Sequence, residues 1–422
     1  MTIPNPTPTK TVVVLGSAYG GIGAAGSLAR RLPPDWRVVV IDRNTHANHV
    51  YPFPRFTVLP QHAPKAFLPL TQVLANGRVT EFQPNVPPQD RTGSPLPPAG
   101  PLNHDSPHRQ IHGTITALSR NSVTFTTNGL GDASDRVETV DFDYCVYALG
   151  GALSEPCDVW GEHERGHART GTKKGGVAFL ERKGSVVEAA ESVIVVGGGA
   201  LGIQFATDIK DVHPSKSVTL LHSRTRLMPI YAKGLHDQVV RRCADLGINV
   251  ILGERVVEWP TNPGVVDGSP KTITTDKGSR LSADLVLVCT GSRPHSSFMA
   301  SLDPTTVAEN GCIRVNEALQ VQGEGLDHMF AIGDCADTTA IRAGHMSFAM
   351  GNVAARNIIR LIQGGEMEKY VPEAAKIKVT LGITHNCVAS EIEAVQGDNG
   401  VEDIGAKGMW ALAGAQGMPD DA

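Results

Sequence analysis

Short apolar runs alternate along the chain with longer stretches in which apolar residues recur at helical spacing. Residues 11–15 and 192–196 are two such runs, and each leads into a glycine-rich turn and then a stretch typical of a helix. A further run at 37–42, and another that ends at His222, complete two β-α-β patterns. Because crossover connections of this kind join parallel strands, the pattern predicts two parallel pairs of strands.

The remaining pattern predicts further strands, helices and loops. The runs 113–118, 122–125 and 144–147 favour antiparallel strands that end in a buried one, with turns at 128–129 and 131–132. Strands are expected at 249–252, 284–289 and 330–332, and helices at 177–190, 235–247 and 347–363. The proline-rich residues 83–108 indicate a surface insertion, and the polar residues 161–176 indicate a linker or an exposed loop.

Together these elements indicate an α/β protein with two Rossmann-like dinucleotide-binding domains, the second inserted in the first. After a tail at residues 1–10, we expect the first domain to comprise 11–155 and 290–365, and the second to comprise 177–289. Small-residue turns at 147–151 and 288–294 would let the chain cross tightly between the domains. Residues 366–422 make a small C-terminal region that carries few motifs.

The two glycine turns are the candidate cofactor sites. Gly16 to Gly21 and Gly197 to Gly202 each stand between a strand and a helix, where free amides and the helix dipole favour a pyrophosphate. In the first turn Ala18 replaces the middle glycine, which is tolerated if its φ is negative. Asp42 ends the following strand and can accept two ribose hydroxyls.

The strand after the second turn ends differently. His222, Ser223 and Arg224 stand there in place of a carboxylate, and the two basic side chains could hold a 2′-phosphate through charge-assisted bonds. This favours NADPH over NADH, with a solvated loop arginine as the alternative for Arg224. A later strand runs into Gly333-Asp334, which puts a carboxylate at the sheet edge where ligands of open α/β sheets bind.

Composition narrows the class of protein. The net charge is only −5, so no overall field attracts nucleic acid. The seven cysteines are odd in number and include no CxxC pair, which argues against a disulfide framework, a zinc ribbon or a dithiol shuttle. We expect no metal site. The N-terminus lacks an apolar signal core, residue 2 is not glycine, and no apolar run reaches membrane length, so we expect a cytoplasmic protein.

From about residue 11 to 415, the chain resembles the pyridine nucleotide-disulfide oxidoreductase superfamily of two-dinucleotide flavoproteins. The nearest resemblance is to fungal apoptosis-inducing-factor-like oxidoreductases, which are related to the ferroptosis-suppressor flavoprotein. The motifs that carry it are the segment 49–56 with its aromatic-Pro-Arg pattern, the second glycine turn through Gln204, the residues 221–224 and 289–291, and the run 331–338. The short segments 380–382 and 409–410 also match.

The resemblance implies FAD on the first unit and NAD(P)H on the second. For FAD it implies Gly16, Ala18, Tyr19, Gly20, Gly21, Asp42, Arg43, Arg55, Ile115, Ala148, Gly150, Gly333 and Asp334. For NAD(P)H it implies Gly197, Gly199, Ala200, Leu201, Gly202, His222, Ser223, Arg224, Thr290 and Gly291. Near the flavin ring it places Gln204 and Arg342, and His345 could donate a proton to a reduced acceptor, with a structural histidine as the alternative.

The expected function is an FAD-dependent NAD(P)H oxidoreductase that passes electrons to a quinone-like acceptor. Because Ala18 and Leu149 depart from the family pattern, a catalytically weakened flavoprotein with a signalling or scaffold role is one alternative. A tailoring oxidoreductase of secondary metabolism is another. We expect no nucleic-acid partner and no transmembrane segment, and the sequence leaves open a peripheral membrane contact and a homodimer.

Overall fold

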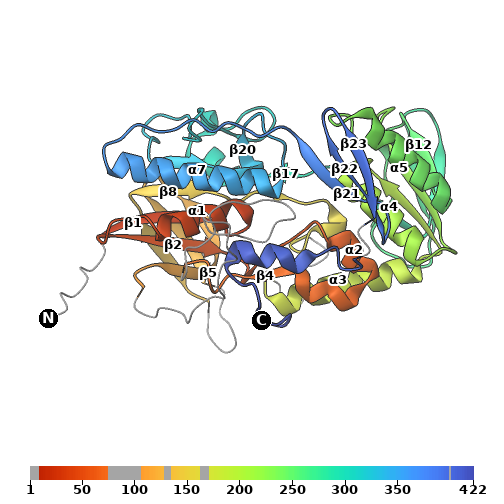
Figure 1. Cartoon of the computed structure of the whole chain (residues 1–422), viewed down its shortest axis with the longest axis horizontal. Helices are drawn as coiled ribbons and strands as arrows, with labels where there is room; N and C mark the ends of the chain where they lie inside the picture. The colour runs from red at the N-terminus through yellow and green to blue at the C-terminus, as the bar shows by residue number, and fades with distance from the viewer. Residues whose placement is uncertain (1–8, 75–105, 128–134, 162–170, 399–400) are drawn as a thin grey trace.

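The computed structural model describes residues 9–74, 106–127, 135–161, 171–398 and 401–422. Most of the proline-rich insertion, the turns expected at 128–129 and 131–132, and the middle of the polar stretch lie outside the described residues. The two ends of Figure 1 hold two separate sheets, each with its own helices. None of the helices in the described part of the chain is both long and apolar enough to cross a membrane.

The larger sheet has the strand order β19-β8-β1-β2-β5-β6-β7. From β19 to β5 all neighbours are parallel, whereas β5, β6 and β7 are antiparallel. Its strands are β1 (Lys10–Leu15), β2 (Trp36–Asp42), β5 (Arg109–Leu118), β6 (Ser122–Thr127), β7 (Val137–Asp141), β8 (Tyr144–Tyr147) and β19 (Met329–Ala331). The late strand β19 therefore returns to a sheet that the first residues of the chain began.

Two helices cover one face of this sheet, α1 (Tyr19–Ala29) and α7 (Gly344–Ile362). Their backbones cross closely, since a Cβ on Gly351 would lie 2.2 Å from the Gly20 carbonyl oxygen. The apolar face that the sequence predicts for the later helix, including Phe348, Ala355 and Ile358, is buried in the core. This contact brings the first glycine turn beside the start of α7.

The smaller sheet is fully parallel, in the order β12-β11-β10-β16. It comprises β10 (Ser192–Val196), β11 (Ser217–His222), β12 (Asn249–Leu252) and β16 (Leu285–Val288), with helices α4 (Ala200–Val212) and α5 (Lys233–Leu246). An antiparallel sheet of β13 (Val256–Glu258), β14 (Lys271–Thr275) and β15 (Arg280–Ala283) adjoins it. In sequence this unit lies between β8 and β19, so the second Rossmann-like unit is inserted in the first.

Two crossing segments join the units. The strands β9 (Gly151–Ala152) and β17 (Arg293–Pro294) pair with each other, and they lie at the small-residue turns that the sequence suggests for crossing. The remaining elements outside the C-terminal region are β3 (His46–Asn48), α2 (Phe53–Val58), η1 (Pro60–Ala66), β4 (Phe67–Pro69), η2 (Glu155–Cys157), α3 (Lys173–Ala189), α6 (Ser297–Leu302), η4 (Pro304–Thr306), β18 (Ile313–Arg314), η5 (Gly333–Cys335) and β20 (Ala336–Asp337).

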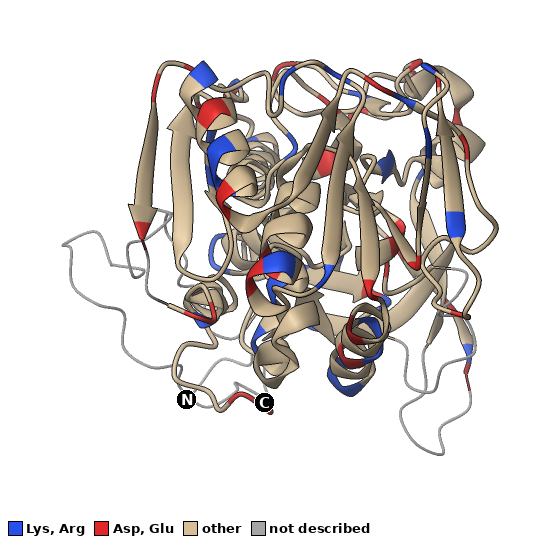
Figure 2. Ribbon diagram, turned by 90° about the vertical axis from the view of Figure 1, so that its right-hand side faces the viewer, with Lys and Arg blue, Asp and Glu red and all other residues tan. Residues whose placement is uncertain are grey.

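The C-terminal region contains a sheet that the sequence pattern does not predict. Its antiparallel strands are β21 (Lys376–Thr380), β22 (His385–Ser390) and β23 (Ala394–Asp398), followed by the 3₁₀ segment η6 (Ala406–Ala413). Figure 1 shows these blue strands beside α4 and α5, and η6 beside β4. Figure 2 shows acidic and basic residues interspersed over this side of the molecule.

Candidate cofactor sites

The first glycine turn has the geometry of a phosphate cradle. Gly16 adopts φ +93°, and a Cβ there would lie 2.6 Å from the Ala148 carbonyl oxygen. At Gly21 a Cβ would lie 1.9 Å from the Gly16 carbonyl oxygen, so the turn and the helix require both glycines. Ala18 is the N-cap residue of α1 with φ −78°, a region that alanine adopts without strain. The departure at Ala18 therefore leaves the backbone of the turn intact.

Asp42 is fixed at the end of β2 by the turn itself. Its Oδ2 accepts from the backbone N of Ser17 (2.6 Å) and from Ser17 Oγ (2.9 Å). Its Oδ1 accepts from the backbone N of Asn44 (2.7 Å) and from Asn44 Nδ2 (3.1 Å). Ribose hydroxyls would replace the two side-chain donors, and the two backbone bonds hold the carboxylate in position for them.

The second turn repeats the first with its glycines complete. Gly197 has φ +125°, and its Cβ position lies 2.2 Å from the Cys289 carbonyl oxygen. A Cβ on Gly202 would lie 1.8 Å from the Gly197 carbonyl oxygen, so here too the turn closes on its helix. Ala200 and Leu201 form the first turn of α4 directly after Gly199, so their backbone amides stand at the N-terminus of that helix.

Three glycines at these turns face open space. Gly150 (φ +63°), Gly199 and Gly291 (φ +83°) have no atom within 4 Å of the position that a Cβ would take. Gly150 follows β8 beside the first turn, while Gly199 is the N-cap residue of α4 and Gly291 follows β16 beside the second turn, next to Thr290. Room in front of a glycine at each turn is what an approaching pyrophosphate needs. The residues present therefore fit two dinucleotides.

The end of β11 supplies donors and no carboxylate. His222 Nδ1 accepts from the backbone N of Gly198 (3.0 Å), so a neutral ring carries its proton on Nε2. That Nε2 is buried and finds no hydrogen-bond partner among the described residues. Burial, and then the charge of Arg224, lowers the pKa of His222, which keeps the ring neutral near pH 7. Ser223 and the exposed Arg224 follow directly on the loop.

Asp334 lies at the carboxyl edge of the larger sheet, in η5 after Gly333 (φ +73°). Together with Arg342 and Cys312 it lines a small pocket that is open to solvent. Burial raises the pKa of the Asp334 carboxyl, and the charge of Arg342 opposes that rise. Arg342 Nη2 lies 3.0 Å from Cys312 Sγ, so its guanidinium stands at this pocket.

Aromatic residues surround the start of α7. Tyr19 Oη and His49 Nδ1 are hydrogen bonded at 2.6 Å. The centroid of the Tyr51 ring lies 6.0 Å from that of Tyr19 and 5.6 Å from that of His49. Tyr51 Oη accepts from the backbone N of Gly344 (2.7 Å), while 41% of the Tyr51 side chain stays exposed. The adjacent His345 is partly buried, and burial lowers the pKa of its imidazole.

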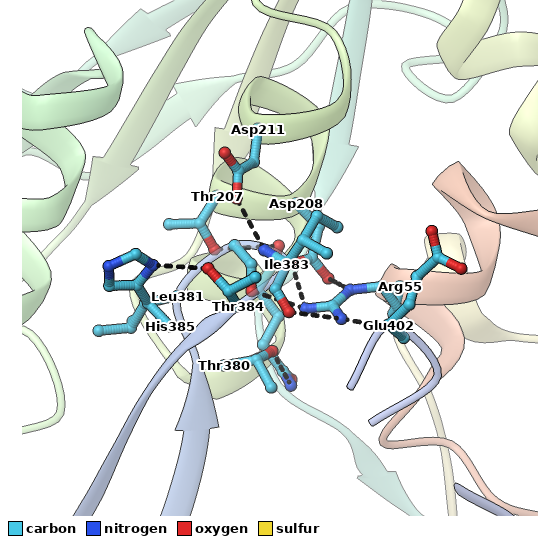
Figure 3. A network of polar contacts seen from close by, with 12 residues as sticks. Arg55, Thr207, Asp208, Asp211, Thr380, Leu381, Ile383, Thr384, His385 and Glu402 are labelled. Carbon is cyan, nitrogen blue, oxygen red and sulfur yellow. Dashed lines mark hydrogen bonds and ion pairs between the residues drawn. The ribbon is translucent and has the colours of Figure 1, made fainter. Parts of the chain in front are cut away.

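Arg55 occupies a different place from the one expected for a residue that contacts FAD. Its guanidinium makes a bidentate pair with Asp208 of α4 at 3.0 and 3.1 Å, and both side chains are at most 1% exposed. The remaining N–H groups donate to the carbonyl oxygens of Gly382 (2.7 Å), Glu402 (2.9 Å) and Ile383 (3.3 Å). Every N–H of Arg55 is thus engaged within the protein, as Figure 3 shows, and none is left for a cofactor.

The same region contains Gln204. It is buried on α4, and its Nε2 donates to Thr380 Oγ1 at 3.0 Å, at the end of β21. Arg242 of α5 also turns inward and donates to the Leu381 carbonyl oxygen and to Asp211. The C-terminal sheet is therefore tied by side chains to the unit that carries the second turn. Ile115, also predicted, lies on β5 opposite Phe125 of β6 and is half-buried.

The paired glycine cradles, with a carboxylate after the first and basic residues after the second, define a two-dinucleotide flavoprotein oxidoreductase. The family model for pyridine nucleotide-disulphide oxidoreductases matches residues 10–365. The chain belongs to this family, and it uses FAD and NAD(P)H. All seven cysteines are buried and free.

Named relatives agree with this assignment. Fe-regulated protein 8 of Mycosarcoma maydis is 35% identical over 414 residues, which cover 96% of this chain and 95% of that protein. Ferroptosis suppressor protein 1 of Mus musculus is 32% identical over 201 residues, 46% of this chain and 52% of that protein, so this match spans about half of the relative.

Solved structures share the fold at low identity. NDH2 from Plasmodium falciparum in complex with NADH has a TM-score of 0.67 at 11% identity and covers 97% of this chain and 99% of that one. The water-forming NADH oxidase from Lactobacillus brevis bound to NADH has a TM-score of 0.61 at 19% identity and covers 90% of this chain and 75% of that one.

Proposed function

We propose that this oxidoreductase passes the electrons of NAD(P)H through FAD to a quinone-type acceptor. The observation that carries the acceptor class is the cluster of rings at the start of α7, whose exposed member is Tyr51. A flat acceptor gains contact area by stacking on such a ring. Because the chain has no CxxC pair to serve as a dithiol relay, electrons would leave the flavin directly for this acceptor.

Bound FAD supplies the reversible hydride chemistry, while the protein binds, orients and shields the rings. The first turn would hold its pyrophosphate, Asp42 its adenosine ribose and Asp334 its ribityl chain. Ala148 and Gly150 line the same edge of the sheet, because they follow β8. Arg55 would act one step away, by fixing the two units to each other.

For the coenzyme we favour NADPH. The second turn would hold its pyrophosphate, with Thr290 and Gly291 on the neighbouring strand end. The charge of Arg224 would face a 2′-phosphate, with the neutral ring of His222 beside it, whereas NADH offers a hydroxyl that needs no cation. Since His222 is neutral near pH 7, the cation in this pair is Arg224.

Three side chains are proposed to act near the flavin ring. The cation of Arg342 would stabilise negative charge on the reduced ring, and Gln204, held by Thr380, would contact the ring without carrying charge. His345 would donate a proton to the reduced acceptor. Because burial lowers its pKa, the imidazole is mostly neutral at pH 7, and we expect acceptor reduction to speed up as the pH falls.

The weakened-flavoprotein alternative draws no support from the backbone. Neither Ala18 nor Leu149 has a positive φ, so both depart from the family pattern without strain. A tailoring oxidoreductase acting on a polyketide-like quinone would be one particular case of the proposed acceptor class, and an acceptor panel distinguishes it.

The acceptor is tested by mixing anaerobically reduced protein with quinones or with ferricyanide and following the return of flavin absorbance. We expect short-chain quinones to reoxidise the flavin within seconds, and Tyr51→Leu to slow this step about fivefold, from ~1 kcal/mol of lost ring contact. Ferricyanide, which needs no stacking, serves as the control and should react equally with both proteins. A reduced flavin that quinones do not reoxidise contradicts the proposed acceptor while leaving the flavoprotein assignment intact.

A further inference from the structure

Trp160 lies beside the expected adenosine end of the FAD site, although it follows Asp42 by more than a hundred residues. Its indole Nε1 donates to Asn44 Oδ1 at 2.9 Å, and Asn44 in turn donates to Asp42. Its backbone N donates to Asp158 Oδ1 at 3.0 Å, which closes the turn after η2. The crossing segment between the two units is thereby bound to the end of β2.

The Trp160 ring also holds Arg43. The guanidinium carbon of Arg43 stands 4.6 Å from the ring centroid, in the geometry of a cation–π contact. The Arg43 backbone is fixed from the other side, since its carbonyl oxygen is hydrogen bonded to His112 Nε2 at 3.0 Å. Burial lowers the pKa of Arg43, against the charges of Asp42 and Asp158, so this cation lies in a partly enclosed place.

A second, independent feature points to a ligand at this place. His295 follows β17 on the other crossing segment, and its Nε2 is buried without a hydrogen-bond partner in the described part of the chain. Its backbone N donates to the Gly150 carbonyl oxygen at 2.9 Å, which places His295 beside the first turn, and burial followed by the charge of Arg43 lowers the pKa of its imidazole, which keeps the ring neutral near pH 7. A neutral imidazole nitrogen left without a partner suits a purine nitrogen or a ribose hydroxyl.

We propose that Trp160 is a positioning residue for the adenine of FAD. It holds the Arg43 guanidinium flat beside the ribose carboxylate Asp42, where adenine can stack on it, and His295 Nε2 contacts the adenosine directly. Planar guanidinium groups stack on aromatic faces, which suits the role of Arg43. A purely structural role for Trp160, as packing for the crossing segment, is the alternative that the test must separate.

The test compares FAD with FMN, which lacks the adenosine. Holoprotein is equilibrated with mixtures of FAD and FMN, and the bound flavins are then quantified. Trp160→Leu should lower the retained FAD-to-FMN ratio about tenfold, by loss of a cation–π contact of ~1.4 kcal/mol. A packing defect would weaken both flavins alike and leave the ratio unchanged.

Trp36→Leu is the matched control. Trp36 begins the strand that Asp42 ends, and it carries its own cation contact, with Lys10 Nζ 5.1 Å from the ring. This substitution should lower the melting temperature and leave the FAD-to-FMN ratio at the wild-type value. An equal ratio in Trp160→Leu and Trp36→Leu overturns the proposal.

A double-mutant cycle with Arg43→Leu tests, without the use of FMN, whether Trp160 acts through Arg43. If Trp160 acts through Arg43, Trp160→Leu in the Arg43→Leu background should change the rate of FAD release by less than twofold. Full additivity of the two substitutions would show that Trp160 does not position Arg43, and it would refute the mechanism proposed here.

Discussion

The buried pair of Arg55 and Asp208 offers a sharp prediction about stability. Asp208→Asn keeps the shape of the side chain and removes its charge, which leaves the Arg55 cation buried against carbonyl oxygens alone. Burial raises the pKa of the Asp208 carboxyl and the charge of Arg55 lowers it, so the two groups depend on each other. Removing one partner of a buried pair costs about 3–5 kcal/mol.

The loss of stability in Asp208→Asn is compared with that of a second ion pair, whose aspartate lies on the same helix α4. Asp211 accepts from Arg242 Nη2 at 3.1 Å and from the backbone N of Ile383 at 2.7 Å, but its side chain is 24% exposed. Solvent screens that pair, so Asp211→Asn should cost about 1 kcal/mol. Both pairs bind the 381–383 loop, so the comparison isolates burial of the charge.

The assay is urea unfolding of FAD-loaded protein, followed by tryptophan fluorescence. We expect Asp208→Asn to lower the free energy of unfolding by at least 2 kcal/mol more than Asp211→Asn, the difference between the two classes of pair. The combined replacement Arg55→Met with Asp208→Leu should recover most of this loss, because it removes both buried charges. Equal costs for the two aspartate substitutions would refute this reading of the pair.

Three further predictions follow from the sites. Arg224→Ala should raise the KM for NADPH about tenfold or more, because one charge-assisted bond is lost, and should leave the KM for NADH unchanged. Equal changes of KM for both coenzymes in steady-state assays would exclude a contact between Arg224 and the 2′-phosphate. Gly199→Ala faces open space and should keep the melting temperature while weakening coenzyme binding, whereas Gly202→Ala, with its Cβ 1.8 Å from the Gly197 oxygen, should lower the melting temperature itself. Burial lowers the pKa of His49 from 6.5 to about 3, so the stabilising effect of the neutral ring is complete above pH 6.5 and is lost as the pH falls towards 3. His49→Gln should therefore reduce the slope of the unfolding free energy against pH in this range by ~1.4 kcal/mol per pH unit. An unchanged slope counts against a neutral buried ring.

Local patterns were sufficient to predict both glycine turns and the elements around them. The helix expected at 347–363 runs Gly344–Ile362, and the strand expected at 249–252 is β12. Such elements follow from the spacing of apolar residues and from glycines whose φ or close contacts exclude a side chain. The fold class is confirmed for the same reason, because each β-α-β unit is encoded within about thirty residues.

Contacts between distant segments could not be predicted from local sequence patterns. Arg55 belongs to the segment 49–56, whose resemblance to the family suggests a contact with FAD. Its partner Asp208 lies 153 positions further along the chain, and no local pattern indicates that the two residues pair and link the units. The C-terminal sheet was missed because Lys376 and Lys378 alternate with apolar residues over only five positions. The sequence around Trp160 does not indicate its place beside the FAD site, because that place depends on contacts with Arg43 and Asn44, which lie far earlier in the chain.

The central claim is that a nicotinamide ring and the flavin ring meet in one protein. It is tested most directly by anaerobic titration of the FAD-loaded protein with NADPH and, separately, with NADH, carrying the reacting hydrogen as deuterium in a parallel rapid-mixing experiment. We predict full bleaching of the flavin at one equivalent of coenzyme, slowed by the deuterium because hydride passes from ring to ring. Flavin absorbance that stays unchanged with both coenzymes would contradict the account.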